Sequence, residues 1–536
     1  MQRPRSRGTL SLDGGPFRRA AGGVAALIPV LLLTLATCER APAPPAVTTA
    51  PPPPQEDGRA PAVVTLLYTT DEHGWVTPST DKGEVRGGAA ELLAHWVARE
   101  NHCPGRAPGV DPSDLPACRD PSTLALSGGD NWTGPAISSY FQGIPMAEAM
   151  GRMGYAASAF GNHEFDFGRD GFVRNRAVAG FPYLAANLRV EGDGNAAVDV
   201  PAFAVFERRG MRIGVIGLAT EDTLRTAMAS RYQGIEFEAE EAALARVVPE
   251  AWRAEPDALV LIAHECPDKL EPLIARHPEW SLSFVGGGHC HKKIEARVHG
   301  APLVNPGWRL RSYARVQLEI DPRRPLQKRV VSSAMEVVEV SHPEGAPLAP
   351  PDEPIAKASA AWQERLDQAL GEPLGYSDGM ERDSADIGHW IGEAWREELK
   401  VDVAILNKGG IRQAVPRGPV TKATVYSVLP FDNKLIVCSL EGREILQHLR
   451  NKEAIGIGLA PAGKGNFVLA DGQPLEADRS YSVATVDFLY FGGDGFAFQD
   501  QDPSPRWTGV DWRAPVISWT RAQASSPAAP LERKIR

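Results

Sequence analysis

The stretch Gly161-Asn162-His163-Glu164-Phe165-Asp166 directly follows Tyr155–Phe160, an apolar run that predicts a buried strand. Asparagine, histidine and aspartate side chains thus gather where this strand ends. In open α/β sheets, ligands bind beyond the carboxyl ends of the strands. We therefore expect this polar hexapeptide to lie at a ligand site.

Four other predicted strands end in the same way. Each is an apolar run that leads into His, Asp or Asn, which are side chains that bind metal ions. Because the carboxyl ends of neighbouring parallel strands meet at one edge of a sheet, we expect all five clusters to converge on one site. The other four clusters are Asp71-Glu72-His73, Asp130-Asn131, His264 and His289-Cys290-His291.

The chain has 536 residues, which is too long for one hydrophobic core, so two or more domains are expected. Apolar runs alternate with helical patterns over residues 62–341, which favours an α/β domain. Residues 342–374 predict a Pro-rich linker and a bridging helix. A second, smaller α/β domain is predicted at residues 375–520, followed by a tail at residues 521–536.

The N-terminus has the pattern of a targeting segment. Five arginines precede the apolar run Val24–Thr37, which is too short for a membrane span. The end of this run resembles a bacterial lipoprotein signal with lipidation at Cys38; a plain secretory signal is the alternative. We expect a signal peptide at residues 1–37, a Pro-rich tether at residues 38–61, and an exported periplasmic or cell-envelope lipoprotein held to the membrane by its lipid anchor.

Charge and composition exclude some classes of function. The formal net charge is −10, and no basic run is long enough to indicate binding to a nucleic-acid polymer. An acidic enzyme with an anionic substrate needs local positive charge, which metal ions would supply. Nothing in the sequence implies an obligate protein partner.

The chain has six cysteines, and an exported protein can keep disulfides. Cys103 and Cys118 flank a loop rich in Pro, Gly and Asp that a disulfide could close. Cys266 and Cys290 lie beside clustered histidines and could also pair if those histidines share a site. Cys438 is expected to be a buried small hydrophobe.

The clustered side chains exceed what one metal ion needs. Carboxylate, amide and imidazole groups together suit divalent ions such as Mn, Zn or Co. Two ions that share a bridging carboxylate fit better than one, and metal pairs about 3.5–4 Å apart are the usual centre for hydrolysing phosphate esters. The candidate ligands are Asp71, His73, Asp130, Asn162, His264, His289 and His291.

His163 need not be a metal ligand. A histidine beside a dinuclear site can donate a proton to the leaving oxygen or stabilise the transition state. Asp166 follows three residues later and could orient this imidazole and raise its pKa. For any single histidine of the site, a structural role is the alternative.

Taken in order, these motifs resemble the five signature blocks of calcineurin-like metallophosphoesterases. The run from Gly161 to Gly168 is similar to that of the bacterial 5′-nucleotidase/UDP-sugar hydrolase subfamily. The resemblance implies an N-terminal metallophosphoesterase β-sandwich flanked by helices and a smaller α/β C-terminal substrate-binding domain. It also implies two metal sites, one formed by Asp71, His73, Asp130 and His291 and the other by Asp130, Asn162, His264 and His289.

The same resemblance implies roles for residues outside the metal sites. His163 would be the catalytic histidine, paired with Asp166. Phe431 and Phe488 match two aromatic residues that sandwich a nucleobase, although core packing is the alternative for both. The remaining substrate contacts would be Asn407 and Arg412, in the turn Asn407-Lys408-Gly409-Gly410-Ile411-Arg412, and Asp494, which matches the acid that holds the ribose.

The predicted function is hydrolysis of nucleotides by a water that two metal ions activate, in an exported enzyme of the 5′-nucleotidase type. The substrate partner would be a nucleotide or a nucleotide sugar. One alternative is a related hydrolase of UDP-sugars, cyclic nucleotides or sulfur esters. Another, of a different class, is a non-catalytic surface binding protein that contains metal. The presence of His163 beside a full ligand set favours catalysis.

Overall fold

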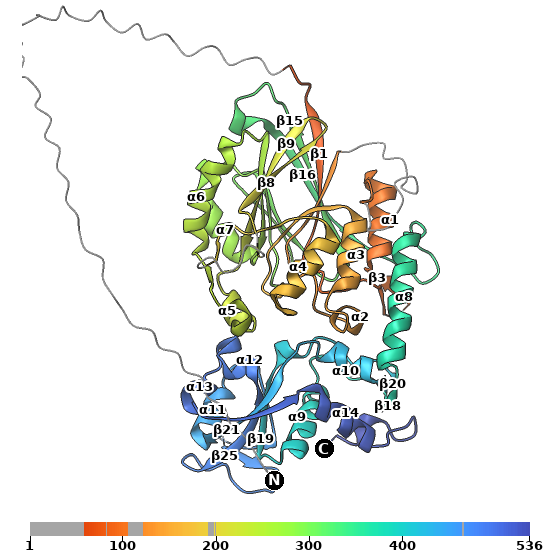
Figure 1. Cartoon of the computed structure of the whole chain (residues 1–536), viewed down its shortest axis with the longest axis vertical. Helices are drawn as coiled ribbons and strands as arrows, with labels where there is room; N and C mark the ends of the chain where they lie inside the picture. The colour runs from red at the N-terminus through yellow and green to blue at the C-terminus, as the bar shows by residue number, and fades with distance from the viewer. Residues whose placement is uncertain are drawn as a thin grey trace, which may run out of the picture. The chain divides into compact units, whose positions relative to one another are not determined.

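The computed structural model describes residues 58–81, 83–105, 122–190, 198, 200–463 and 466–535. The predicted signal peptide and the predicted lipidation site, Cys38, lie outside this part of the chain. From Glu56 onward the chain forms one compact unit that mixes helices and strands, as Figure 1 shows. This organisation confirms the predicted α/β class.

Three of the five polar clusters belong to a six-stranded sheet. In order across the sheet, the strands are β16 (Val330–Glu339), β15 (Ser312–Ile320), β1 (Ala62–Thr69), β4 (Thr123–Ser127), β5 (Tyr155–Ala159) and β6 (Tyr183–Leu184). Strands β1, β4, β5 and β6 pair in parallel. Strands β15 and β16 extend the sheet in the antiparallel sense. The carboxyl ends of β1, β4 and β5 therefore lie at the same edge.

The other two clusters belong to a second six-stranded sheet. Its strands, in order, are β13 (Lys293–Val298), β14 (Ala301–Pro306), β12 (Phe284–Gly286), β11 (Ala258–His264), β9 (Met211–Ala219) and β8 (Phe203–Arg208). The four central strands are parallel, and the two edge strands are antiparallel to their neighbours.

The two sheets pack face to face around a shared apolar core. Side chains alternate along β1, so that Leu66 enters this core while Leu67 packs with the helices on the outer face. Val260 and Phe284 reach the same core from the second sheet and are fully buried. Strands that are apolar on both faces are typical of sheets covered on both sides. The β-sandwich flanked by helices is therefore confirmed.

Helices cover the outer faces of the sandwich, as Figure 1 shows. On the first sheet, α1 (Ala89–Glu100), α3 (Ile144–Met153) and α4 (Gly168–Ala179) share one apolar cluster. On the second sheet, α6 (Glu240–Arg253) and α7 (Pro267–Ala275) share another. The buried side chains of α6 recur every three or four residues, so one face of this helix meets the sheet.

The C-terminal part of the chain (residues 373–535) has its own apolar core. Its five-stranded sheet has the order β22 (Ala454–Ile457), β19 (Val403–Asn407), β25 (Ser480–Val486), β21 (Lys434–Glu441) and β26 (Arg506–Asp511). Two helices, α9 (Ala385–Leu399) and α14 (Arg513–Ala522), pack against each other beside this sheet. Cys438 is buried in this core, as predicted.

Helix α8 (Glu353–Leu370) contacts both parts of the chain. The Asp352 carboxylate caps its N-terminus by accepting a hydrogen bond from the Ile355 N–H at 3.1 Å, and it pairs with buried Arg152 at 3.1 Å. Leu366 packs in the cluster that covers the first sheet, and the helix also meets α10 (Lys422–Val428). The predicted bridging helix falls on α8. Among the described residues, the structure has no helix that combines the length and apolar character needed to cross a membrane.

The structure corrects one of the cysteine interpretations. Cys266 and Cys290 are free thiols, so the pairing considered for them is wrong. They are neighbours all the same, because a hydrogen bond with Cys290 raises the pKa of Cys266. Cys103 is disulfide-bonded, and its predicted partner, Cys118, lies outside the described residues.

His102 is buried beneath α3 and offers a test of pH-dependent stability. Its Nδ1 lies 2.9 Å from Thr123 Oγ1 and its Nε2 lies 2.7 Å from the Met153 carbonyl, so a neutral imidazole satisfies both contacts. Burial lowers the pKa of His102 to about 4, whereas the unfolded side chain titrates near about 6.5. Unfolding therefore takes up a proton as the pH falls below that value. We expect this residue to cost about 2 kcal/mol of unfolding free energy between pH 7 and pH 5.

Denaturant unfolding of the wild type and of His102→Gln at both pH values measures this effect. The glutamine variant should lose less unfolding free energy on acidification than the wild type, by about 2 kcal/mol. An equal loss in both proteins would show that His102 is not the group that takes up the proton.

Candidate active site and metal centre

The five polar clusters meet at one edge of the sandwich. All seven candidate ligands lie at the carboxyl ends of parallel strands, and both sheets contribute. The strands and their ligands are β1 with Asp71 and His73, β4 with Asp130, β5 with Asn162, β11 with His264, and β12 with His289 and His291.

The backbone at this edge is unusual. Five of the candidate ligands have φ values between 45° and 66°, in the left-handed region. This conformation is uncommon outside glycine, and strained residues of this kind cost about 1–3 kcal/mol each. Strain that gathers in one place is typical of functional sites. The five residues are Asp71, His73, Asp130, His289 and His291.

One group of ligand atoms is formed by Asp71, His73 and His291, which all lie within 4.8 Å of one another. The two imidazole Nε2 atoms are 3.0 Å apart, and His291 Nε2 is 3.3 Å from Asp71 Oδ1. His73 Nδ1 lies 3.0 Å from the Thr133 carbonyl, and donation of its N–H there leaves the Nε2 lone pair facing the group. Asp71 Oδ1 is buried and has no hydrogen-bond partner.

A second group surrounds His264. Its Nε2 lies 3.1 Å from Asp130 Oδ2 and 3.0 Å from Asn162 Oδ1, and His289 Nδ1 lies 3.0 Å from the same amide oxygen. His264 Nδ1 faces the Gly128 carbonyl at 2.8 Å, so a hydrogen bond there would direct the Nε2 lone pair into the group. Asp130 Oδ2 is also 3.8 Å from His73 Nε2. Asp130 thus lies between the two groups.

Buried neighbours hold these ligands in place. Asp130 Oδ1 accepts a hydrogen bond from the His163 N–H at 2.8 Å, and Asp71 Oδ2 accepts one from the His289 N–H at 3.1 Å. A Cβ at position 161 would lie 2.2 Å from Asp130 Oδ1, so only glycine fits there. The Glu164 carboxylate accepts from the backbone N–H groups that follow β4. The sequence pattern did not single out Glu164 as a supporting residue, although it lies inside the quoted motif.

The electrostatics of the second group indicate that it needs a cation. Burial opposes charge on both Asp130 and His264, but their mutual attraction outweighs it. The pKa of Asp130 is therefore held well below its usual range, and the pKa of His264 is raised to about 10. In this state a proton balances the buried carboxylate. A metal ion would replace that proton, because binding to imidazole requires the neutral form.

The donor set fits divalent metal ions. Lone pairs of imidazole nitrogens and carboxylate or amide oxygens point at one another, which repels unless a proton or a cation lies between them. The unpartnered Asp71 Oδ1 and the lone pairs of His73 and His264 are such atoms. Nitrogen and oxygen donors of this kind suit Zn, Mn and Co ions.

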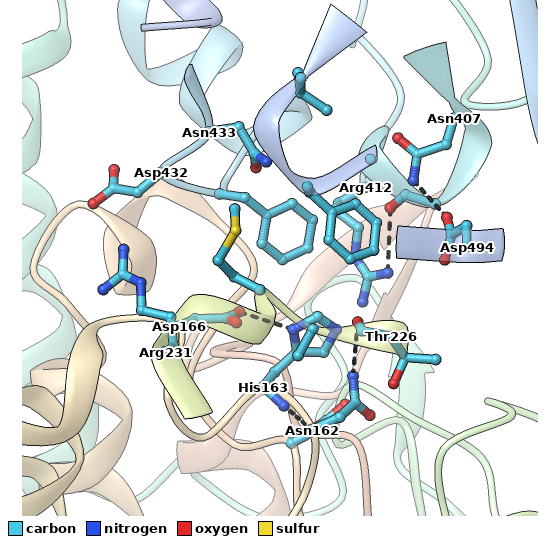
Figure 2. Close-up of a pocket in the computed structure, with 18 of the residues that line it drawn as sticks. Asn162, His163, Asp166, Thr226, Arg231, Asn407, Arg412, Asp432, Asn433 and Asp494 are labelled. Carbon is cyan, nitrogen blue, oxygen red and sulfur yellow. Dashed lines mark hydrogen bonds and ion pairs between the residues drawn. The ribbon is translucent and has the colours of Figure 1, made fainter. Parts of the chain in front are cut away.

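His163 lies beside the ligands and is oriented by Asp166. His163 Nδ1 lies 2.8 Å from Asp166 Oδ2, and Figure 2 shows the two side chains facing each other. The imidazole also stacks on the Phe431 ring, with 5.3 Å between centroids. Burial disfavours the charged imidazole, but the carboxylates of Asp166 and Asp130 outweigh it and raise the pKa of His163. The side chain can therefore hold a proton at its Nε2 while Nδ1 is engaged.

Both parts of the chain line a pocket over this site. From the sandwich come Asp130, Asn162, His163 and two of the other ligand histidines. From the C-terminal part come all five residues predicted to contact substrate: Asn407, Arg412, Phe431, Phe488 and Asp494. Figure 2 shows Asn407, Arg412 and Asp494 on one side and His163 with Asn162 on the other.

The Gly-rich turns place polar groups in this pocket. Asn407 Nδ2 donates to Asp494 Oδ2 at 2.7 Å, and Asp494 has a left-handed backbone, with φ of 51°. A Cβ at position 493 would lie 2.4 Å from the Phe488 ring, so glycine is needed for the close approach. Arg412 Nη2 lies 3.3 Å from His73 Nε2, so its guanidinium reaches the metal-ligand cluster.

Several lining residues carry no sequence signal. Trp512 donates from Nε1 to the Phe431 carbonyl at 2.8 Å and so fixes that aromatic residue. Asn433 donates to Asp487 Oδ1 at 2.8 Å and lines the pocket beside Phe431. Met228 and Arg231 come from the sandwich, in a connection without a recognisable motif. Only Asn433 could have been suspected, because it lies two residues after a predicted contact.

The two-sheet sandwich and the smaller α/β part define the fold of a two-domain metallophosphoesterase, a hydrolase that acts on phosphoric ester bonds. Comparison with known proteins narrows this class. Residues 374–468 match the family model described as 5′-nucleotidase, C-terminal domain. The C-terminal part of this chain is therefore similar to the 5′-nucleotidase family.

Named relatives span most of the chain. Protein UshA of Yersinia enterocolitica is 26% identical over 515 residues, which cover 83% of this chain and 88% of that protein. The 5′-nucleotidase of Vibrio cholerae is 25% identical over 536 residues, covering 88% and 90%. The crystal structure of a 5′-nucleotidase precursor from Thermus thermophilus has a TM-score of 0.72 at 22% identity, covering 89% of this chain and 99% of that one. This last likeness concerns the fold.

Proposed function

We propose that this protein is a metal-dependent phosphoesterase that hydrolyses nucleotides in the manner of a 5′-nucleotidase. One observation carries the proposal. A single pocket is lined by His163 and candidate metal ligands on one side and by Phe431, Phe488 and Asp494 on the other. A nucleotide fits such a pocket, because its phosphate can face the metal ligands while its nucleoside faces the aromatic and acidic residues. The names of several relatives support the same substrate class.

In this proposal the domains keep the predicted boundaries. Residues 62–341 would form the hydrolytic domain and residues 375–520 the substrate-binding domain, with residues 342–374 between them. The first metal ion would be held by Asp71, His73, Asp130 and His291. The second would be held by Asp130, Asn162, His264 and His289. When bound, two such ions acidify a water and neutralise charge on the phosphoryl oxygens.

The chain's own residues would bind and orient the ester. Arg412 can hold the phosphate, because a guanidinium presents parallel donors to phosphate oxygens. Phe431 and Phe488 can stack on the base, and the Asp494 carboxylate can accept hydrogen bonds from ribose hydroxyls. His163, with Nδ1 held by Asp166 and a raised pKa, can donate from Nε2 to the phosphoryl group or to the leaving oxygen.

The test is phosphate release by the fragment that begins at Glu56. The substrates are AMP, ATP, UDP-glucose, a 2′,3′-cyclic nucleotide and p-nitrophenyl phosphate, each with Mn, Zn, Co and no metal. Metal-dependent release from AMP or UDP-glucose, with little from p-nitrophenyl phosphate, is expected. Activity on p-nitrophenyl phosphate alone would keep the hydrolytic site and overturn the nucleotide pocket. No phosphate release with any of the metals would favour a sulfur-ester substrate or a binding role.

Phe488→Ala tests the stacking pocket. Base stacking contributes about 1–3 kcal/mol, so KM for AMP should rise about 5- to 150-fold. Turnover of p-nitrophenyl phosphate should change little, because that substrate has no base. Phe491→Ala is the matched control, since Phe491 lies three residues away, is 43% exposed and does not line the pocket. Equal KM values for wild type and Phe488→Ala would assign Phe488 to core packing.

We also propose that the protein is exported and anchored through lipidated Cys38. The arginine-rich start, the short apolar run and Cys38 support this proposal. Mass spectrometry of the N-terminal peptide from protein purified out of native membranes is the test. A peptide that begins at lipid-modified Cys38 is expected, and an unmodified N-terminus further along the chain would favour a plain secretory signal.

A further inference from the structure

The connection between β14 and β15 is fixed on the candidate metal ligands. The Arg309 N–H donates to the Asp71 carbonyl at 2.9 Å. The neighbouring Trp308 ring stacks on the His291 imidazole, with 4.4 Å between centroids and 9° between planes. Arg309 and Leu310 both have left-handed backbones, with φ of 62° and 55°. This short segment therefore adopts a strained conformation directly against the site.

The side chain of Arg309 crosses from the sandwich to the C-terminal part. Its Nη2 donates to the backbone carbonyl of Arg412 at 2.9 Å. Its guanidinium carbon lies 3.5 Å from the Trp308 ring centroid and 4.6 Å from that of Trp75. Cations over aromatic faces are attracted by the ring quadrupole, so the two rings fix the direction of the guanidinium.

This position is unfavourable for a cation. Burial and the positive charges of Arg311, Arg412 and Arg382 lower the pKa of Arg309. Its Nε is buried without a hydrogen-bond partner, and no carboxylate of the described residues lies within ion-pair distance of it. A guanidinium in such a place costs stability. The hydrogen bond to the Arg412 carbonyl, together with the two aromatic rings, can offset this cost.

The Arg412 carbonyl lies at the end of the Gly-rich turn and belongs to the residue whose side chain reaches the metal-ligand cluster. Within the C-terminal part, Arg382 Nε donates to the preceding carbonyl, that of Ile411, at 2.8 Å. Arg309 therefore holds the same turn from the opposite side. Together the two contacts fix the backbone of this turn beside the metal-ligand cluster. The Arg412 side chain then reaches that cluster, with its Nη2 at 3.3 Å from His73 Nε2.

We propose that Arg309 is a positioning residue that docks the turn ending at Arg412 over the metal-ligand cluster, so that the Arg412 guanidinium faces the phosphoryl group of the substrate. This role rests on the proposed function only for the identity of the substrate. The base and ribose contacts do not involve Arg309. Its loss should therefore affect turnover more than nucleoside affinity.

The test compares Arg309→Met with Arg311→Met in the metal-loaded enzyme. Methionine keeps an apolar chain between the tryptophan rings and removes the donor. Arg311 is the matched control, because it also lies over Trp75, at 5.7 Å, but its Nη2 donates to Ser79 of the N-terminal part and not to the C-terminal part. Arg309→Met should lower kcat about 10- to 100-fold, since a small misplacement of a positioning group has effects of that size. KM for AMP should change by less than about threefold, and Arg309→Lys should recover part of the loss.

Hydrogen exchange gives a readout that does not depend on activity. Amides of residues 408–414 should exchange several-fold faster in Arg309→Met than in wild type, whereas Arg311→Met should match wild type. Unchanged exchange together with unchanged kcat would overturn the proposal. If Arg309→Met did not fold, Arg309→Gln with wild-type exchange and wild-type kcat would also overturn it, because the glutamine side chain is too short to reach the Arg412 carbonyl. If the wild type released no phosphate from nucleotides, the proposed function would fail, while the exchange result would still decide whether Arg309 docks the turn.

Discussion

Replacing His163 with alanine is expected to lower kcat for AMP by about 10²- to 10⁴-fold while leaving the metal content unchanged. The imidazole is held by Asp166 at 2.8 Å, and its backbone N–H, not its ring, contacts Asp130. It can therefore act on the substrate without serving as a ligand. Steady-state phosphate release and elemental analysis of the dialysed protein measure the two quantities.

The pH profile adds a second readout for the same variant. Asp166 and Asp130 raise the pKa of His163 against the opposing effect of burial, so the proton is retained to higher pH and lost as the pH rises through the raised value. The kcat of the wild type should thus fall at high pH as His163 deprotonates. This decrease should be absent in His163→Ala. His299→Ala is the control, because His299 is exposed and does not line the pocket. Retention of wild-type kcat in His163→Ala would remove this residue from the mechanism.

The strand-end pattern predicts the convergence of the ligands because it depends on local sequence. A short apolar run favours a strand that is covered on both faces, and a polar residue directly after such a strand lies at the edge of the sheet. Asp71 and His264 are examples, since Asp71 follows a strand that is buried from Val64 onward and His264 ends a fully buried strand. The pairing of β1 with β15, whose residues are about 250 positions apart in the chain, has no such local signal. The sandwich could be anticipated only from the family resemblance.

Residues that make contacts over long separations in the sequence escaped prediction for a related reason. Arg309 contacts a carbonyl 103 positions away and lies in a short connection without periodicity. Trp512 fixes Phe431 across 81 positions. The wrong pairing of Cys266 with Cys290 shows that a correctly predicted proximity can still give a wrong bond. Closeness in space was foreseen from the shared histidine site, but closeness does not decide between a disulfide and two thiols.

Replacing Asp130 with asparagine should have the largest effect on the metal centre. Its Oδ2 lies 3.1 Å from His264 Nε2 and 3.8 Å from His73 Nε2, which places one carboxylate between the two ligand groups. Asparagine preserves the shape of this buried side chain but removes the negative charge that both ions would share. Metal affinity should fall by more than the about 10- to 100-fold that loss of an outer hydrogen-bond partner costs. Turnover should fall by about 10³-fold or more, since metal ions supply several kcal/mol of charge stabilisation.

Titration calorimetry and elemental analysis would show whether both ions are affected. Asp268→Asn is the control, because Asp268 is exposed on α7 and its only described ion pair is with Lys292 at 3.8 Å. A variant that retained one ion at wild-type affinity and lost the other would assign Asp130 to a single site. A variant that bound two ions as tightly as wild type would exclude the bridging role. Weakening of both ions together is the result that a shared carboxylate requires, because neither group then keeps its full negative charge.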